Sequence, residues 1–340
     1  MNQIIPFDPD GPPAADAGFF GLSPRREDSR VVITAAPFEA TVSYRTGTAD
    51  APESMRIASH QIDLFDLDVG TPTEQGIFYD DTPSRLADSS KETRAFAERV
   101  VDAITSNCAP DPLHLASVNE ASRNMVGQIH GQTQVVLHED KLPFLVGGDH
   151  SVSEGSIRAV AESVSRLTIL QFDAHADLRK DYEGFTHSHA SVMHNILELH
   201  DDVRLVQVGI RDLCLKEKKR IDSDPRIVLF DDRMLRKARQ AGLQNALFSD
   251  IAKACTESVY ISFDIDGLEP SLCPNTGTPV PGGLFFDEAV SILEEVSRSC
   301  TVVGGDLVEV GVAPTGEWDS VVGARLLHKM IGFALLSQRS

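Results

Sequence analysis

Short, almost uninterrupted apolar runs recur along the chain, and they constrain its fold more than any other feature. They cover residues 31–38, 143–148, 167–173, 204–210, 259–266 and 301–310. Runs of this length without polar alternation are typical of strands in a parallel sheet that is covered on both faces. The chain is therefore expected to build a buried, mainly parallel sheet.

Helical patterns separate these runs. One of these patterns contains Ala289, Ile292, Leu293 and Val296, which follow the i, i+3, i+4, i+7 spacing of a helix with one buried stripe. Alternating strands and helices predict a doubly wound α/β fold. We expect residues 31–340 to form a single domain of this kind. Residues 1–30, rich in Pro, Asp, Gly and Ala, are expected to form an irregular N-terminal arm.

The net charge limits the kinds of partner. The 340 residues carry a formal charge of −20, from 51 acidic and 31 basic side chains. Nucleic acids and anionic membranes are bound through basic surfaces, so neither is expected as a partner. The charge is compatible with a cationic substrate, but a soluble acidic surface is the simpler explanation.

The expected compartment is the cytoplasm. No apolar stretch approaches the roughly 18 residues that span a bilayer. The N-terminus, "MNQIIPFDPDGPP", lacks the basic start and apolar stretch of a secretory signal. The five cysteines are scattered and contain no C-x-x-C pair, which indicates neither a disulfide framework nor a thiolate zinc site.

Several of the predicted strands end in acidic or imidazole side chains. In open parallel sheets, functional groups gather just beyond the carboxyl ends of the strands. Burying such groups is costly unless a partner compensates their desolvation, and a metal cluster would compensate all of them together. The residues at these ends are Asp149, His150, Asp173, His175, Asp177, Asp264, Asp266, Asp306 and Glu309.

The spacing of these residues favours a metal site. In extended backbone, positions i, i+2 and i+4 project to the same side, which aligns Asp173, His175 and Asp177. Together with His150, Asp264 and Asp266, these residues offer more ligands than one catalytic zinc ion takes. They suit two octahedral ions that share carboxylates, and the mixed oxygen and nitrogen ligands favour manganese, with nickel and other divalent ions as alternatives.

Two acidic residues in the same region have a simpler interpretation. Asp149 follows Gly147 and Gly148, and we expect it to accept hydrogen bonds from backbone N–H groups. Asp306 is interpreted as a buried hydrogen-bonding residue. The two glycines allow a tight backbone passage, and without a G-x-G-x-x-G pattern they carry little nucleotide-binding signal.

Five sequence blocks carry a family resemblance: "GGDHS" (147–151), "DAHAD" (173–177), "SFDIDGLEP" (262–270), "GTPVPGG" (277–283) and "DLVEV" (306–310). With these blocks the chain resembles, from about residue 31 to its C-terminus, the ureohydrolases, the arginase and agmatinase family. The segment 37–59 is also similar to the family's N-terminal block. The resemblance implies a three-layer α/β/α fold and a trimeric or hexameric assembly.

The resemblance also implies which residues bind metal. Asp173 and Asp264 would each bind both of two manganese ions. One ion would also bind His150 and Asp177. The other ion would also bind His175 and Asp266. The attacking hydroxide would be hydrogen-bonded to Asp177, which gives this ligand a catalytic role. The implied ligands are His150, Asp173, His175, Asp177, Asp264 and Asp266.

Two further residues match catalytic positions of the family. Glu309 matches the glutamate that pairs with the substrate guanidinium, a planar cation that a carboxylate can bind through two parallel hydrogen bonds. His189 matches a loop histidine proposed to carry a proton to the leaving amine, with an ordinary pKa near the working pH. His187, two residues earlier, is a candidate for lining the entrance.

The loop around His189 bears on the substrate. It reads "FTHSHAS" (185–191) and lacks the Asn-Leu-His-Gly arrangement of arginases, so it looks more like bacterial agmatinase-type enzymes. The expected substrate is a small, cationic, agmatine-like guanidino compound, cleaved to urea and an amine. Three alternatives remain: an arginase or guanidinobutyrase, a mononuclear-metal deacetylase or amidohydrolase, and a non-catalytic binding protein.

Overall fold

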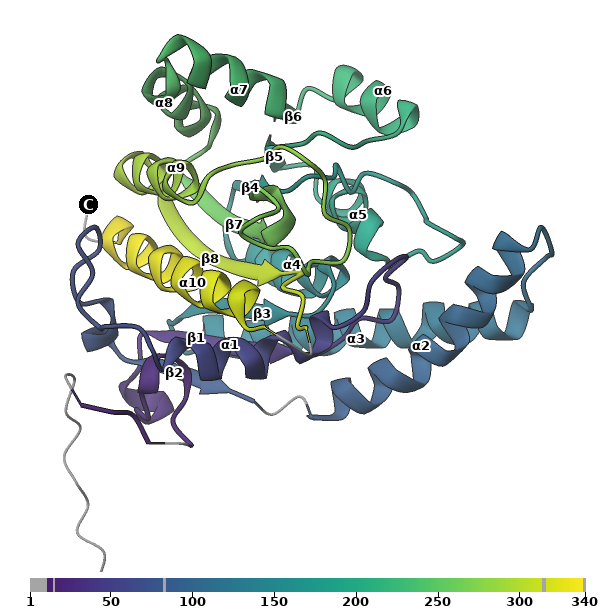
Figure 1. Cartoon of the computed structure of the whole chain (residues 1–340), viewed down its shortest axis with the longest axis horizontal. Coiled ribbons are helices and arrows are strands. Elements are labelled where there is room, and N and C mark those ends of the chain that lie inside the picture. The colour runs from purple at the N-terminus through teal and green to yellow at the C-terminus, as the bar shows by residue number, and fades with distance from the viewer. Residues whose placement is uncertain (1–10, 15, 82–83, 314–315, 339–340) are drawn as a thin grey trace, which may run out of the picture.

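The computed structural model describes residues 11–14, 16–81, 84–313 and 316–338. Its centre is an eight-stranded sheet in which every pair of neighbouring strands is parallel (Figure 1). The strand order is β2-β1-β3-β8-β7-β4-β5-β6. The strands are β1 (Val31–Ala36), β2 (Ile77–Asp80), β3 (Leu142–Gly147), β4 (Leu167–Phe172), β5 (Val203–Val208), β6 (Ile227–Phe230), β7 (Ser258–Asp264) and β8 (Thr301–Val308).

The parallel sheet predicted from the apolar runs is confirmed, with two strands added. Each predicted run overlaps one observed strand, and the additional strands are β2 and β6. These two form the edges of the sheet, and half or more of their residues are only partly buried. Edge strands are covered less completely than central ones, so their sequences need no long apolar run.

Helices cover both faces of the sheet, which confirms the three-layer architecture. The helix α1 packs on β3 and α10, and α10 in turn packs on β8 and α9. On the opposite face α3, α4 and α5 pack on the sheet, and α2 packs on α3. The helices are α1 (Ala51–Ser59), α2 (Ser84–Thr105), α3 (Pro112–His138), α4 (Ser153–Ser163), α5 (Val192–Leu199), α6 (Leu215–Ser223), α7 (Asp232–Ala241), α8 (Gln244–Ala254), α9 (Phe286–Ser299) and α10 (Trp318–Ser337).

The helix predicted from the apolar stripe at Ala289 to Val296 is α9, and this stripe is buried as expected. Ala289, Ile292, Leu293 and Val296 belong to the main hydrophobic cluster beneath this helix layer. The first turn is held by Glu288, whose carboxylate accepts the backbone N–H of the residue before the helix at 3.0 Å. This contact satisfies one of the donors that every helix N-terminus leaves without a partner.

The helix α10 corrects the expectation that no apolar stretch is long enough to span a bilayer. Among the described residues it is the one helix long and apolar enough, by length and composition, to cross a membrane. However, 78% of its apolar window is buried inside the protein. Such burial is characteristic of a core helix, and its apolar composition is explained by packing between α1, α9 and β8.

Part of the predicted N-terminal arm packs on the core. Residues 1–10 and 15 lie outside the described residues. Further along, Phe19 and Phe20 are buried, and the backbone N–H of Phe20 donates to Ser59 Oγ at 2.8 Å. The ring of Phe20 also meets His328 of α10 edge-on. The separation of an arm at residue 30 stays a prediction.

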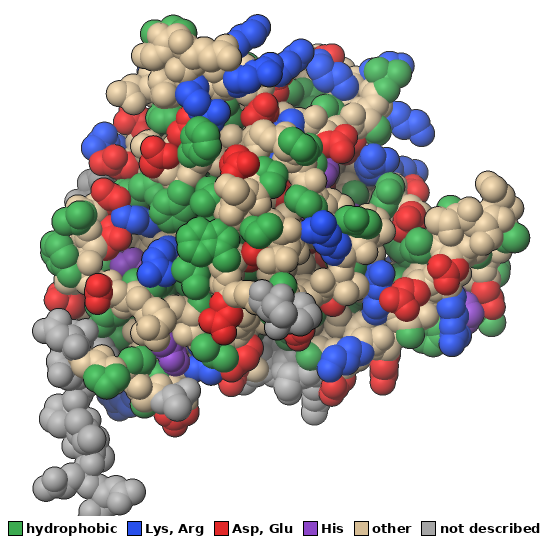
Figure 2. Space-filling view, in the orientation of Figure 1, with side chains coloured by type: hydrophobic (Ala, Val, Ile, Leu, Met, Phe, Trp, Pro, Cys, Tyr) green, Lys and Arg blue, Asp and Glu red, His purple; other side chains and the backbone are tan. Residues whose placement is uncertain are grey.

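Charged side chains are not evenly spread over the surface. On the face shown in Figure 2, Lys and Arg gather over α6 and α7 at the top of the view. The α7 sequence alone, "DRMLRKARQA", carries several of them. The remainder of this face mixes acidic, basic and apolar side chains. The net charge of −20 is therefore an average over regions of different sign.

Candidate metal centre and active site

The sheet order brings the predicted ligands together. The strands β3, β8, β7 and β4 are consecutive neighbours, although they lie far apart in the sequence. All are parallel, so their carboxyl ends meet at one edge of the sheet. The acidic and imidazole residues that follow β3, β4 and β7 therefore converge there, as the sequence predicted.

The first group of ligand atoms surrounds His150, which follows β3. Its Nδ1 lies 2.8 Å from Asp177 Oδ2 and 3.1 Å from Asp173 Oδ2. Asp264 Oδ2 is slightly farther from the same nitrogen, at 3.5 Å. All four side chains are buried. His150, Asp173 and Asp177 form a compact group that could hold one metal ion.

A second group adjoins the first through Asp173. Here His175 Nδ1 lies 3.1 Å from Asp266 Oδ2 and 3.6 Å from Asp173 Oδ1. Asp173, His175 and Asp266 could hold another ion. Asp173 belongs to both groups, as expected for a shared ligand. Asp264 faces the first group but is in neither compact group, so its bridging role stays a prediction.

The carboxylates also hold the loops that carry them. Asp173 Oδ1 accepts the backbone N–H of His175 at 2.6 Å, and Asp264 Oδ1 accepts that of Asp266 at 2.9 Å. Asp266 Oδ1 accepts the N–H of Ala174 at 3.0 Å, which ties the loop after β7 to the loop after β4. In each case the other oxygen remains directed at the cluster.

A hydrogen-bond chain orients His150. Its Nε2 lies 2.9 Å from Ser262 Oγ, and this hydroxyl donates to Asp306 Oδ1 at 3.0 Å. With Nε2–H donating to Ser262, Nδ1 presents its lone pair to the carboxylates. Within the described residues Nδ1 is buried without a hydrogen bond of acceptable geometry. A cation between Nδ1 and the carboxylates would satisfy it, so the donor set fits a metal ion. The predicted hydrogen-bonding role of Asp306 is confirmed.

The electrostatics of the cluster also fit a site for metal ions. Burial, followed by the neighbouring Asp173, raises the pKa of Asp177 to about 7. Burial and then Asp266 raise the pKa of Asp264 well above its usual value. Although burial lowers the pKa of His175, Asp266 and Asp173 raise it to about 12. Without a metal ion the cluster retains protons, and divalent cations would replace them.

The hydrogen-bond chain leads to a prediction for Ser262→Ala. Removing the hydroxyl leaves His150 Nε2 without its acceptor, so the ring loses its fixed orientation. We expect metal affinity to fall about tenfold to a hundredfold, as for other outer-shell partners of metal-binding histidines. Titration of the metal-free protein with Mn²⁺ measures this change. An unchanged affinity would show that the chain does not orient the ligand.

Glu309 lies beside the cluster, just beyond β8. Its Oε1 accepts the backbone N–H of His150 at 2.9 Å. The backbone of Gly277 passes close to the other oxygen, because a Cβ atom added at this glycine would lie 3.2 Å from Oε2. The backbone of Glu309 has a φ of 60°, a left-handed conformation that is uncommon for non-glycine residues and often marks functional positions. Burial, and then the Asp149 carboxylate, raise its pKa well above the usual value, which favours a cationic partner.

Asp149 has the role expected from its position. Its Oδ1 accepts the N–H of Ser151 at 3.0 Å, and its Oδ2 accepts both the N–H and the hydroxyl of Thr41 at 3.2 Å. Both oxygens therefore bind the chain itself. Thr41 in turn supports His189, whose backbone N–H donates to Thr41 Oγ1 at 3.2 Å.

His189 lies at the site but differs from expectation in its protonation. Burial, followed by the cationic His175 and His150, lowers its pKa to about 4. In the metal-free cluster the pKa of His189 therefore lies below the working pH expected from the sequence. The ring is neutral at neutral pH, because positive charge nearby disfavours its protonated form. It must accept a proton before it can deliver one.

A cavity of about 500 Å³ opens onto the cluster. It reaches the metal-binding groups at His175 and Asp177 and passes His189. His187 is not among its lining residues; instead its Nδ1 lies 2.9 Å from the buried Glu154 carboxylate. The contact with Glu154 gives His187 a structural role, and its proposed entrance role stays a prediction. The cavity is lined by Ser43, Tyr44, Arg45, His175, Asp177, Arg179, Tyr182, His189, Ala190, Asp212, Leu213, Glu217, Thr278, Pro279 and Val280.

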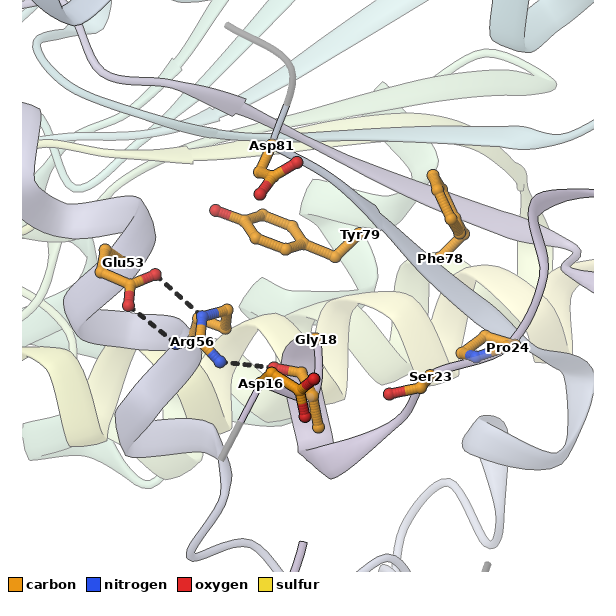
Figure 3. A pocket seen from close by; sticks show the side chains of 10 residues that line it. Asp16, Gly18, Ser23, Pro24, Glu53, Arg56, Phe78, Tyr79 and Asp81 are labelled. Atoms are coloured by element: carbon orange, nitrogen blue, oxygen red, sulfur yellow. Dashed lines mark hydrogen bonds and ion pairs between the residues drawn. The ribbon is translucent and has the colours of Figure 1, made fainter. Parts of the chain in front are cut away.

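Another cavity, of about 430 Å³, lies away from the cluster, between the N-terminal segment, α1 and β2 (Figure 3). Tyr79 and Asp81 face it from β2 and the residue after that strand. On the opposite wall Arg56 makes two hydrogen bonds to Glu53, both from α1. This smaller cavity contains neither of the two candidate metal groups, so we assign the chemistry to the larger cavity.

Sequence reasoning missed several residues that support the site. Gln171 Nε2 donates to Asp173 Oδ2 at 2.8 Å, and Gln207 Nε2 donates to Gln171 Oε1 at 2.7 Å. Both are polar residues inside otherwise apolar strands, a signal that could have identified them. Arg211 donates to four backbone carbonyls, including that of Asp266 at 2.7 Å, and so joins the loops around the cluster.

Comparisons with known proteins agree with this geometry. The arginase family model matches residues 29–332. The N(1)-aminopropylagmatine ureohydrolase of Synechocystis sp. is 30% identical over 92% of this chain and 91% of its own. The agmatinase of Pyrococcus horikoshii is 28% identical over 91% of this chain and 93% of its own.

Solved structures show the same fold. Agmatine ureohydrolase of Thermoplasma volcanium matches with a TM-score of 0.70 and 23% identity, over 92% of each chain. Proclavaminate amidino hydrolase of Streptomyces clavuligerus matches with a TM-score of 0.71 and 23% identity, over 95% of this chain and 98% of its own. With the family model covering most of its length, the chain belongs to the arginase family of ureohydrolases, which hydrolyse C–N bonds.

Proposed function

We propose that this ureohydrolase cleaves a linear, agmatine-like guanidino compound to urea and an amine, using two Mn²⁺ ions. The observation that supports this proposal is the pair of adjoining His/Asp groups that share Asp173 beside the buried Glu309. A single-metal hydrolase would need only one such group. A non-catalytic binding protein would need neither a second metal group nor the buried carboxylate of Glu309 beside the cluster.

In this proposal the chain's own residues divide the work. Asp173 and Asp264 would hold both ions, while His150 with Asp177 and His175 with Asp266 would hold one each. Two divalent ions, when bound, supply a water molecule that is acidic enough to attack near neutral pH. Asp177 would accept a hydrogen bond from the attacking water and so orient it.

Glu309 and His189 act on the substrate. Glu309 Oε2 accepts the guanidinium N–H groups, together with the remaining lone pair of Oε1, and so fixes the carbon that is attacked. His189 is neutral at rest, so it can accept a proton from the attacking side. It then delivers this proton to the amine that leaves.

An acidic residue in the cavity lining supports a substrate with a distal ammonium group. Asp212 lines the cavity, and its carboxylate makes no hydrogen bond or ion pair within the described part of the chain. The two arginines that line the same cavity already contact other groups. Arg45 donates to the Pro274 carbonyl at 2.8 Å, and Arg179 lies over the Tyr182 ring.

A guanidino acid is the second candidate for a specific reason. Arg45 and Arg179 line the same cavity, and either could turn toward a carboxylate at the far end of such a substrate. Two observations favour the amine: the carboxylate of Asp212, and the loop "FTHSHAS", which lacks the arginase arrangement. The relatives named above are themselves called aminopropylagmatine ureohydrolase and agmatinase.

The proposal is tested by urea release and metal content. The purified protein, loaded with Mn²⁺, should bind close to two ions per chain and release urea from agmatine or aminopropylagmatine with a higher kcat/KM than from arginine or guanidinobutyrate. Chelation should remove the activity and Mn²⁺ should restore it. Full activity with a single zinc ion would contradict the binuclear site, and a clear preference for arginine would contradict the substrate.

Asp212→Asn tests how the far end of the substrate is recognised. We expect kcat/KM for agmatine to fall about fivefold, as for an exposed ion pair of about 1 kcal/mol. The value for butylguanidine, which lacks the ammonium group, should stay unchanged. Asp250→Asn, an exposed carboxylate on α8, is the control. Equal losses on both substrates would mean that Asp212 does not bind the ammonium group.

A further inference from the structure

The segment that carries His189 depends on distant helices for its position. It lies between β4 and α5 and contains a tight turn, in which Tyr182 and Phe185 exchange backbone hydrogen bonds of 2.8 and 3.1 Å. Glu183 and Gly184 in this turn have φ values of 56° and 86°. No strand or α-helix runs through residues 178–188, so side chains from elsewhere must hold them.

Two asparagines hold the first part of this segment. Asn119 of α3 donates to the Gly184 carbonyl at 3.1 Å and accepts the Thr186 N–H at 2.9 Å. Asn195 of α5 donates to the Thr186 carbonyl at 2.9 Å. The Phe185 ring is buried in a small cluster with residues of α2 and α3. The segment is thus fixed up to residue 186.

Glu154 of α4 holds the next part. It is 1% exposed, and its Oε2 accepts from Asn195 Nδ2 at 2.9 Å. The same oxygen lies 2.9 Å from His187 Nδ1, and Oε1 lies 3.1 Å from it. Arg158 is farther away, at 4.0 Å. A buried carboxylate is costly without such donors, so the contact with His187 is strongly favoured.

We propose that Glu154 is a positioning residue of the active site, which places His189 at the cavity by holding His187. Only the fully buried Ser188 separates the two histidines. On its other side His189 is held by Thr41. Glu154 is not among the residues that line the cavity, so it acts through the segment and not on the substrate. The activity measurement rests on the proposed function, whereas the exchange measurement below does not.

The test compares Glu154→Ala with the parent in two independent ways. Amide hydrogen exchange over residues 183–191 should become at least about tenfold faster, because local opening becomes easier. The kcat for urea release should fall about tenfold to a hundredfold, the cost of a catalytic group displaced by about 1 Å. KM should change less than about twofold, and the two metal ions should remain bound.

Matched variants separate positioning from general stability. Glu162→Ala removes a carboxylate from the same helix, where it pairs with His130 at 2.9 Å and touches no residue of the segment. It should leave both the exchange and kcat unchanged. His187→Ala should reproduce the effect of Glu154→Ala, and His187→Asn should restore part of kcat, because its amide can donate to Glu154. The double variant Glu154→Ala/His187→Ala should be no worse than Glu154→Ala alone.

Several results would overturn the inference. The inference is wrong if Glu154→Ala matches Glu162→Ala in exchange and kcat, or if its loss of activity follows a loss of metal. If Glu154→Ala does not fold, the more exposed His187→Ala decides by the same criteria. If even the parent releases no urea, the proposed function fails, and the exchange measurement still decides whether Glu154 holds the segment.

Discussion

Asp173→Asn should remove most of the bound metal and lower urea release by at least about a thousandfold, a loss of several kcal/mol in transition-state stabilisation. Asp173 is fully buried and contacts both His150 and His175. It is the residue that the two candidate metal groups share. Asparagine keeps the shape but removes the charge and one acceptor oxygen, so the sites of both ions are weakened at once.

Metal analysis after dialysis and kcat/KM at saturating Mn²⁺ measure these losses. Asp306→Asn is the comparison, because Asp306 is also buried but reaches the cluster only through Ser262 and His150. We expect it to lower kcat/KM about tenfold, as outer-shell changes do. If Asp173→Asn retains two ions and loses less activity than Asp306→Asn, the shared-ligand arrangement is wrong.

Glu309→Gln should lower kcat/KM about tenfold to a hundredfold while the metal content stays near that of the parent. The change removes the charge and places a donor amide where the guanidinium needs an acceptor. A charge-assisted hydrogen bond of this kind contributes about 1.5–3 kcal/mol, and each 1.36 kcal/mol corresponds to a factor of about ten.

The position of Glu309 makes this variant informative. Its carboxylate accepts a backbone N–H from His150 but belongs to neither compact metal group. A glutamine can still accept that hydrogen bond, so the loop after β3 should keep its place. Loss of metal with the fold intact would identify Glu309 as a ligand, and full activity would place the guanidinium partner elsewhere.

The central strands and the residues of the site could be predicted from the sequence because both depend on local patterns. A strand buried on both faces needs an apolar run, and Asp173 or Asp264 directly after such a run is costly unless something binds it. The resemblance to the arginase family added roles for His189 and Glu309. The short edge strands β2 and β6 escaped detection because their partial exposure allows shorter apolar runs.

What the tertiary structure decided depends on which elements become neighbours and how deeply they are buried. The sheet order places β3 beside β8 and β4 beside β7, and so determines that His150 faces Asp173 and Asp177. Burial beside two cationic groups, and not residue type, lowers the pKa of His189. Glu154 meets His187 only because α4 packs on α5. These distances cannot be derived from the spacing of residues along the chain, because they arise only when the helices pack on the sheet.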